Sequence, residues 1–317
     1  TGSDVDVGTT SGSGIDSITV TPNTFGCAHI GANNVTATVY ATNGATGQCT
    51  AVVTVEDTTS AIAICQDITV QLDGSGNVSI TTGQIDNGSN DNCTGVSLVI
   101  SPNTYNCSNI GNNNLTLTAA DAYGNDGTCI SVVTVEDNID PTAICQNATI
   151  QLDDSGNGVL TTGDVDNGSS DVCSAVSLVV VPTSFNCSNL GANAFTLTAT
   201  DVNSNSDNCT GQVTVEDNVP PTALCQDVTI QIDGGGTATL TTGDVDNGST
   251  DNCGVSSLSV SPNSFDCDDL GPHFVSLTVT DGSGNSSICT TTVSVADDGG
   301  NCASCAPVLG SCPADII

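Results

Sequence analysis

The chain has 317 residues, 35 acidic side chains and no lysine or arginine, so its formal net charge is −35 with neutral histidines. A charge of this size repels nucleic acid and anionic lipid, which excludes both as partners and favours divalent cations. Seventeen cysteines indicate disulfides in an oxidising, extracellular compartment. No apolar run approaches the about 18 residues of a membrane helix, so membrane insertion is not expected.

Cysteines recur at four positions with a spacing of 80 residues, which identifies a tandem array. We therefore predict an incomplete module at 1–57, three complete modules at 58–137, 138–217 and 218–297, and a tail at 298–317 that is a candidate donor strand. The four cysteine positions are Cys65, Cys145 and Cys225; Cys93, Cys173 and Cys253; Cys107, Cys187 and Cys267; and Cys129, Cys209 and Cys289.

Within a module, apolar residues alternate with polar ones, and clusters of Gly, Asn, Asp and Pro separate the alternating runs. In chain order, the last complete module is predicted to have strands near 225–233, 237–245, 255–262, 273–280 and 288–296. The fold class that this pattern favours is all-β, with tandem immunoglobulin-like β-sandwich modules of 80 residues. Phe25, Tyr105, Phe185 and Phe265 each precede a cysteine by two residues and are expected to fill the core.

A small module with few aromatic residues needs disulfides to stabilise it. The first module keeps Cys27 and Cys49 but has Ser13 where Cys93 would stand, and it lacks the first cysteine position. If cysteines that are lost together are partners, the disulfides are Cys27–Cys49, Cys65–Cys93, Cys107–Cys129, Cys145–Cys173, Cys187–Cys209, Cys225–Cys253 and Cys267–Cys289. Cys302, Cys305 and Cys312 of the tail are expected to form one further disulfide rather than a redox or zinc site.

Residues 1–13 align without gaps on residues 161–173, so the first module lacks the counterpart of residues 58–80. Its sandwich would expose a strand edge, and an uncovered edge invites aggregation. The tail occupies the sequence position where a new module would start. In an end-to-end rod it could not reach its own first module, which predicts that it adds a strand to the next copy and builds a filament. The alternative is that the chain limits reflect a proteolytic cut.

Acidic residues recur at three places in each complete module: a Glu-Asp pair at its start, a loop with two aspartates, and an aspartate at a strand end. Ser11 and Ala41 replace the second loop aspartate and the strand-end aspartate in the first module, so we expect these two positions to touch. Calcium is the predicted structural ligand, and solvated acidic loops are the alternative. The candidate ligands are Glu56, Asp57, Asp86, Asp91, Asp121, Glu136, Asp137, Asp166, Asp171, Asp201, Glu216, Asp217, Asp246, Asp251 and Asp281.

Short sequence signals also mark candidate glycosylation sites. Asn-x-Ser/Thr motifs recur at Asn87, Asn167 and Asn247, and an Asp-Ser/Thr-apolar pattern of bacterial O-glycosylation surrounds Ser17 and Thr58. Both kinds of motif arise readily by chance in a chain this rich in Asn and Thr.

The phrases Glu216-Asp-Asn-Val-Pro-Pro-Thr-Ala, Asp246-Asn-Gly-Ser-Thr-Asp-Asn-Cys and Thr280-Asp-Gly-Ser-Gly-Asn together resemble hyalin-repeat (HYR-type) immunoglobulin-like modules of Bacteroidetes surface proteins. The resemblance spans nearly the whole chain and implies a secreted adhesive or structural array. Glu216, Asp217 and Asn218 are also similar to the calcium linker of cadherins.

Every polar constellation either repeats with the module or stands alone, so we expect no enzymatic activity. The function favoured is a subunit of an extracellular filament, present on the cell surface or released, whose partners are copies of itself. The alternative is a single-chain adhesin stalk stiffened by calcium, or an array that binds surface glycans or ice. Thr196, Thr198 and Thr200 form the kind of threonine row that such binding needs.

Overall fold

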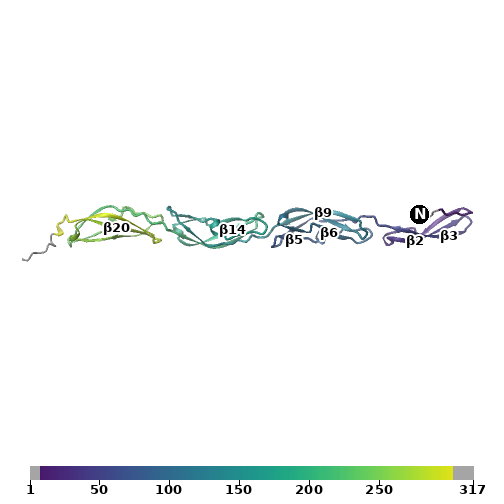
Figure 1. Ribbon diagram of the computed structural model, residues 1–317, viewed down its shortest axis with the longest axis horizontal. Helices are drawn as coiled ribbons and strands as arrows, with labels where there is room; N and C mark the ends of the chain where they lie inside the picture. Colours follow the sequence, from purple (N-terminus) through teal and green to yellow (C-terminus); the bar gives the residue numbers. More distant parts are fainter. Residues whose placement is uncertain (1–7, 303–317) are drawn as a thin grey trace, which may run out of the picture. The chain divides into compact units, whose positions relative to one another are not determined.

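The computed structural model describes residues 8–302, and its fold is all-β, as predicted (Figure 1). The described chain divides into two compact units. One holds the residues up to Ile139 together with Asp171–Ser174, and the other holds Asp140–Ser170 and the residues from Ala175 onward. None of the described helices is both long and apolar enough to cross a membrane.

The second repeat has a four-stranded sheet in the order β4-β9-β8-β6 and a two-stranded sheet formed by β5 and β7. β4 pairs parallel with β9, whereas the other pairs are antiparallel. Its elements are β4 (Ile68–Gln71), β5 (Asn77–Ser79), α2 (Thr82–Ile85), β6 (Ser97–Ser101), β7 (Thr104–Asn106), η2 (Cys107–Asn109), β8 (Gly111–Ala120) and β9 (Asp126–Glu136).

The same order of elements recurs twice along the chain. The third repeat has β10 (Ala148–Gln151), β11 (Asn157–Val159), α3 (Thr162–Val165), β12 (Ser177–Val181), β13 (Ser184–Asn186), η3 (Cys187–Asn189), β14 (Gly191–Thr200) and β15 (Ser206–Glu216). The fourth has β16 (Val228–Gln231), β17 (Thr237–Thr239), α4 (Thr242–Val245), β18 (Val255–Ser261), β19 (Ser264–Asp266), η4 (Cys267–Asp269), β20 (Gly271–Asp281) and β21 (Ser286–Ala296).

The strand predicted at 237–245 is in fact the short strand β17 followed by the single helical turn α4. Thr241 precedes the turn in an extended conformation, and its backbone N–H and hydroxyl both donate to the carboxylate of Asp244. This arrangement satisfies a backbone donor at the start of the helix, which a strand at the same place would leave to a neighbouring strand. Val245 at the end of the turn is fully buried.

The alternating residues of the long strands form the core of each complete repeat. In the fourth repeat, Leu277 and Val279 of β20 and Val293 of β21 are fully buried and pack with Phe265. Tyr105 and Phe185 are buried at the corresponding places, as predicted. Burial of these residues supplies the hydrophobic stabilisation of each small module.

The first repeat consists of a three-stranded sheet, β1 (Ile15–Thr21), β2 (Gly31–Ala41) and β3 (Thr46–Val55), together with the short turn η1 (Cys27–His29) (Figure 1). The strands that correspond to β4 and β5 do not occur in its described part. Residues 24–26, which align with β7, therefore have no strand partner there and are not assigned as a strand. Phe25 is only half-buried, although it was expected to fill the core.

The predicted disulfide pairing is wrong for every pair. Two kinds of disulfide occur, and neither joins the cysteines that the sequence argument paired. Disulfides within a repeat span 64 residues and join its first and fourth cysteine positions: Cys65–Cys129, Cys145–Cys209 and Cys225–Cys289. Disulfides spanning 66 residues join the third position to the second position of the following repeat: Cys27–Cys93, Cys107–Cys173 and Cys187–Cys253.

The two cysteine positions that are absent from the first repeat therefore belong to different kinds of disulfide. The second position bonds the third position of the preceding repeat, and the first position bonds the fourth position of its own repeat. Cys49, expected to bond Cys27, is exposed and has no disulfide partner among the described residues. Cys302 of the tail bonds Cys267, and Cys305 and Cys312 lie outside the described residues, so the expected disulfide within the tail stays a prediction.

Candidate metal centres and an open sheet edge

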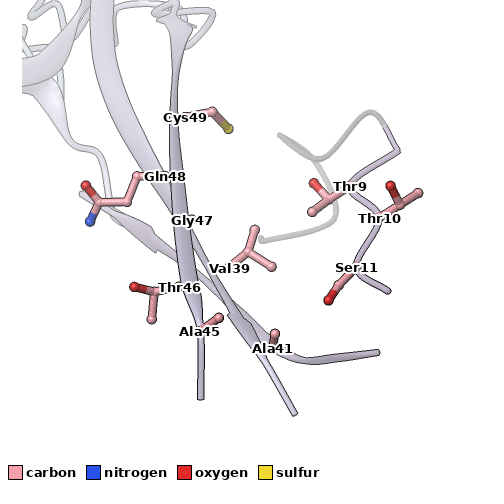
Figure 2. Close-up of a pocket in the computed structure, with 10 residues that line it drawn as sticks. All are labelled: Thr9, Thr10, Ser11, Val39, Ala41, Ala45, Thr46, Gly47, Gln48 and Cys49. Atoms are coloured by element: carbon pink, nitrogen blue, oxygen red, sulfur yellow. The ribbon is translucent and has the colours of Figure 1, made fainter. Parts of the chain in front are cut away.

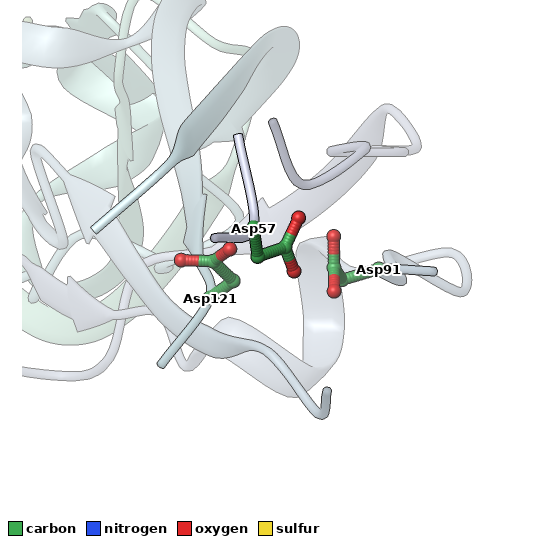
Figure 3. Close-up of side chains that lie close together, drawn as sticks. All are labelled: Asp57, Asp91 and Asp121. Carbon is green, nitrogen blue, oxygen red and sulfur yellow. The ribbon is translucent and has the colours of Figure 1, made fainter. Parts of the chain in front are cut away.

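Three aspartates from separate segments meet at the start of the second repeat, and three equivalent ones meet in the fourth. One carboxylate oxygen from each of Asp57, Asp91 and Asp121 lies within 4.8 Å of the others, and Figure 3 shows Asp57 between the other two. Asp217, Asp251 and Asp281 are brought together in the same way. The corresponding Asp137, Asp171 and Asp201 are divided between the two compact units.

Local hydrogen bonds fix each aspartate of the fourth-repeat cluster. Asp251 follows a loop and accepts the backbone N–H groups of Cys253 and Gly254 on Oδ2, at 2.8 and 3.0 Å. Asp281 ends β20 and accepts the N–H of Ser283 at 2.9 Å and of Asn285 at 2.8 Å on Oδ1. Such Asx turns arise from the Asp-Gly-Ser-Gly-Asn and Asp-Asn-Cys sequences themselves.

Asn285 connects the cluster to the preceding segment. Its Nδ2 donates to Oδ2 of Asp281 at 2.7 Å and to the backbone carbonyl of Asp217 at 2.9 Å. Asn125 donates in the same way to Asp121 and to the carbonyl of Asp57. This asparagine escaped the sequence analysis, although it recurs with the module period and only Ala45 departs from it, in the repeat that also lacks the strand-end aspartate.

The hydrogen bonds leave specific carboxylate oxygens for another ligand. Oδ2 of Asp217 and Oδ1 of Asp251 are buried and have no hydrogen-bond partner among the described residues, and the same is true of Asp57 Oδ2 and Asp91 Oδ1. Asp217 and Asp281 are each only 3% exposed. A buried anionic oxygen without a partner is costly, and the chain has no lysine or arginine to neutralise it.

The donor set fits a hard divalent cation. Calcium binds carboxylate, carbonyl and water oxygens, and three aspartates converging from three segments supply the charge that it requires. Hydrogen bonds from the backbone N–H groups of Cys93 and Thr94 lower the pKa of Asp91. Burial acts to raise the pKa of Asp121, but hydrogen bonds from Asn125 and Tyr123 outweigh it and leave the pKa below its ordinary value. Both groups are therefore ionised at neutral pH, as a cation site needs.

Other predicted ligands lie outside these clusters. Asp86, Asp166 and Asp246 accept hydrogen bonds from the backbone N–H of Ser89, Ser169 and Ser249, and hydrogen bonds from these serines lower the pKa of all three carboxyl groups. Glu136 and Glu216 accept from Gln71 and Gln151, and Glu56 is exposed. The predicted glycosylation residues Ser17, Thr58, Asn87, Asn167 and Asn247 are all exposed, and their modification stays a prediction.

No such cluster occurs in the described part of the first repeat, where Ser11, Ala41 and Ala45 stand in place of Asp91, Asp121 and Asn125 of the second. These three residues line a pocket of about 360 Å³ together with Val39 and Cys49. Figure 2 shows Val39 and Cys49 projecting toward the segment Thr9–Ser11. The pocket is therefore weakly polar and carries no ionised side chain.

The sheet beside this pocket ends at β3, and among the described residues no strand pairs with its outer edge. The equivalent edges of β9, β15 and β21 are each paired with a parallel strand. As a result, Val53 is half-buried, whereas the equivalent Val133 and Val293 are 0% exposed.

The surface at Gly47 is also uncovered in the described part of the chain. A Cβ added there would meet no described atom within 4 Å. A Cβ added at the equivalent Gly127 would lie 1.8 Å from the carbonyl oxygen of Ala61, in the segment that leads into β4. The complete repeat thus has backbone packed directly onto a surface that the described part of the first repeat leaves open.

Comparison with known proteins identifies no family. No protein-family model matches the chain, and no curated protein matches it; the hyalin-repeat resemblance therefore stays a prediction from sequence phrases. Solved structures that resemble it are extracellular tandem domains. Protocadherin gamma B2 extracellular cadherin domains 1–5 are 12% identical with a TM-score of 0.28, covering 89% of this chain and 74% of that one.

Two further structures have a similar relation to the chain. Mouse cadherin-23 EC22–24 is 12% identical with a TM-score of 0.33, covering 74% of this chain and 96% of that one. Sidekick-1 immunoglobulin domains 1–5 are 10% identical with a TM-score of 0.30, covering 84% and 67%. The chain thus resembles extracellular tandem arrays of immunoglobulin-like and cadherin domains.

Proposed function

We propose that this protein is a structural subunit of an extracellular filament. In the filament, residues 298–317 of one copy add a strand to the open first repeat of the next copy. The observation that carries the proposal is the unpaired outer edge of β3 beside half-buried core residues. The seven disulfides of the described chain support the oxidising location.

Strand addition fits this edge for three reasons. The complete repeats pair the equivalent edge with a parallel strand, so the sheet already has the geometry for a fourth strand. The added strand would bury Val53 and Val55 and satisfy backbone groups of β3. Because the donor and acceptor surfaces differ, the contact is head to tail and does not close on itself.

Calcium belongs to the same proposal as a structural ligand at Asp57, Asp91 and Asp121 and at Asp217, Asp251 and Asp281. A cation there would offset carboxylate oxygens that are buried without a partner. It would also tie the segment leading into a repeat to two loops of that repeat, which limits bending at that point. The same clusters support the second candidate function, a single-chain stalk that calcium stiffens without polymerisation.

The test uses a tail variant as a chain terminator. Val308 stands at the sequence position of Ile68, Ala148 and Val228, so Val308→Asp should prevent a copy from donating its strand but not from accepting one. Ser311→Asp is the matched control, because Gln71, Gln151 and Gln231 at that position are exposed.

Electron microscopy of the wild-type chain in moderate salt, which screens repulsion between subunits, should show filaments. A minor fraction of Val308→Asp should shorten them, and the same fraction of Ser311→Asp should not. Monomeric chains in all samples, with calcium and with a chelator, would reject the filament and leave the single-chain stalk.

A further inference from the structure

Cys49 on β3 is the only cysteine in the described chain that is not in a disulfide, and it is exposed. It occupies the fourth cysteine position of the repeat. In the complete repeats this position belongs to Cys129, Cys209 and Cys289, and each bonds the first-position cysteine of its own repeat. Cys49 therefore occupies the position of a disulfide-bonded cysteine, but it lies on a sheet edge where no described strand supplies the partner cysteine.

The partner cysteine in each complete repeat comes from the segment that leads into the parallel edge strand. Cys65 lies eight residues after Asp57 and three residues before β4, and Cys145 and Cys225 stand at the same distances from Asp137 and β10 and from Asp217 and β16. A strand that completes the first repeat would carry a cysteine to Cys49 if it follows the same spacing.

Residues 303–317 contain this spacing. Asp297 is the counterpart of Asp217, and Cys305 follows it by eight residues. An alanine stands two residues before the cysteine in every case, and an apolar residue stands three residues after it: Ala63, Cys65 and Ile68; Ala143, Cys145 and Ala148; Ala223, Cys225 and Val228; Ala303, Cys305 and Val308.

The second kind of disulfide, which joins neighbouring repeats, could not form between two copies of the chain. Cys267 holds the third position, whose partner elsewhere is the second-position cysteine of the following repeat, but a following copy would offer Ser13 there. Cys302 of the same chain bonds Cys267 instead. The junction between copies would also lack an acidic cluster, because Ser11 and Ala41 replace two of its three aspartates. Two copies could therefore be joined neither by the disulfide nor by the acidic cluster that connect neighbouring repeats.

We propose that Cys305 of one copy forms a disulfide with Cys49 of the next, and that this bond covalently locks the filament. The inference rests on the proposed strand donation, which would bring the two thiols together. Each bond formed takes two electrons and two protons from the thiols, and an external disulfide oxidant such as glutathione disulfide accepts them and becomes two thiols. Docking comes first and exchange second, because thiol–disulfide exchange depends on access of the attacking sulfur.

The test combines two single substitutions in the full chain. Of the two cysteines in the proposed bond, Cys49→Ser keeps only Cys305 and Cys305→Ser keeps only Cys49; both variants keep Cys312, and neither substitution removes a disulfide of the described structure. Each sample is incubated with a glutathione redox buffer, blocked with alkylating agent, denatured and separated without reductant. Wild type should give a reducible ladder of multiples of 31.4 kDa.

Each variant alone should give monomer, and a mixture of the two should give a single covalent dimer and nothing larger. Cys312→Ser is the matched control and should keep the full ladder. Mass spectrometry after digestion with a protease that cuts at aspartate should identify the Cys49–Cys305 peptide pair, because trypsin has no site in this chain.

Several outcomes would overturn the inference. Wild-type filaments in which Cys49 stays open to alkylation would reject the disulfide and keep strand donation. A dimer of Cys305→Ser alone would assign the bond to Cys49 or Cys312 of the two copies, and a Cys305–Cys312 peptide in assembled filaments would assign Cys305 elsewhere. If neither filaments nor a ladder form, the proposed function fails together with the inference.

Discussion

The first and fourth repeats share spacing, strand order and much of their sequence, yet the described part of the first repeat lacks the edge strand and the two-stranded sheet of the fourth. In the fourth repeat β16 covers β21, Val293 is fully buried and Cys289 is bonded. In the first repeat Val53 is half-buried, and among the described residues no strand pairs with the outer edge of β3 and no cysteine bonds Cys49. In these modules the buried residues of the sheet edge and the bonded fourth-position cysteine occur together with the paired edge strand.

The first and fourth repeats also differ in the acidic cluster. The fourth repeat has Asp251, Asp281 and Asn285, and the first has Ser11, Ala41 and Ala45 at the same places. A complete repeat thus carries carboxylates where the preceding segment enters it, and the open repeat carries small neutral side chains and a pocket. Ser11, Ala41 and Ala45 offer no carboxylate to a cation at this place.

The largest effect that distinguishes the two repeats should come from their cysteines. Cys225→Ser together with Cys289→Ser removes a disulfide that spans 64 residues. We expect the fourth repeat to lose about 4 kcal/mol of stability through the entropy of its unfolded state. Cys49→Ser should leave the first repeat of the isolated subunit unchanged. Hydrogen exchange of β20 and β21 against β2 and β3 measures both, and equal losses in the two repeats would contradict the comparison.

Core truncation should separate the repeats by a smaller amount. Phe265 is 3% exposed and packs in the core of the fourth repeat, so Phe265→Ala should cost about 3 kcal/mol. Phe25 at the same position is half-buried, and Phe25→Ala should cost less than half as much in the isolated subunit. Urea unfolding followed by hydrogen exchange gives both values. A full core cost for Phe25→Ala would mean that the first repeat is closed.

The sequence predicts the array, the all-β fold and the core aromatics, because the spacing of the cysteines and the alternation of apolar residues are local properties that recur in each repeat. It also predicts contact between Asp91 and Asp121 from their joint replacement by Ser11 and Ala41, and the structure brings these two aspartates together. It does not separate the cluster ligands from Asp86 or Glu56, because turn-capping aspartates and metal-binding aspartates have the same flanking sequences.

Disulfide connectivity is the clearest failure of sequence reasoning here. Joint loss of two cysteine positions indicates a pair only if each module contains both partners of its bonds. In this chain one disulfide per junction joins neighbouring repeats, as Cys27–Cys93 does, so the two cysteine positions absent from the first repeat are not partners. The spacing of the cysteines alone could not distinguish disulfides between neighbouring repeats from disulfides within one module.

Calcium should stabilise the fourth repeat and leave the sheet of the first repeat unaffected. At a free concentration one hundred times the dissociation constant, we expect about 2.7 kcal/mol of stabilisation, lost on addition of a chelator. Asp251→Asn removes one ligand and should abolish most of this gain, whereas Asp244→Asn, outside the cluster, should keep it. Titration calorimetry and hydrogen exchange with and without calcium test this. Equal protection of β2 and β21 by calcium would assign the effect to general charge screening.

The smallest predicted effect concerns acid stability and the turn that precedes β18. Two hydrogen bonds from Ser249 lower the pKa of Asp246, and the bond from its side chain has a larger effect than the bond from its backbone N–H. Because the folded-state pKa is depressed, the carboxylate stabilises the fold above the ordinary pKa of about 3.9, and the contribution disappears as the pH falls through the folded-state value. Asp246→Asn should therefore cost about 1 kcal/mol at pH 7 and nothing near pH 2.

Urea midpoints of the wild type and of Asp246→Asn at the two pH values measure this difference. Asp268→Asn, which removes the same charge from an exposed position, is the control for net charge and should be neutral or slightly stabilising in a chain of −35. If Asp246→Asn were also neutral at pH 7, the hydrogen bonds between Asp246 and Ser249 would add nothing to the stability of the repeat.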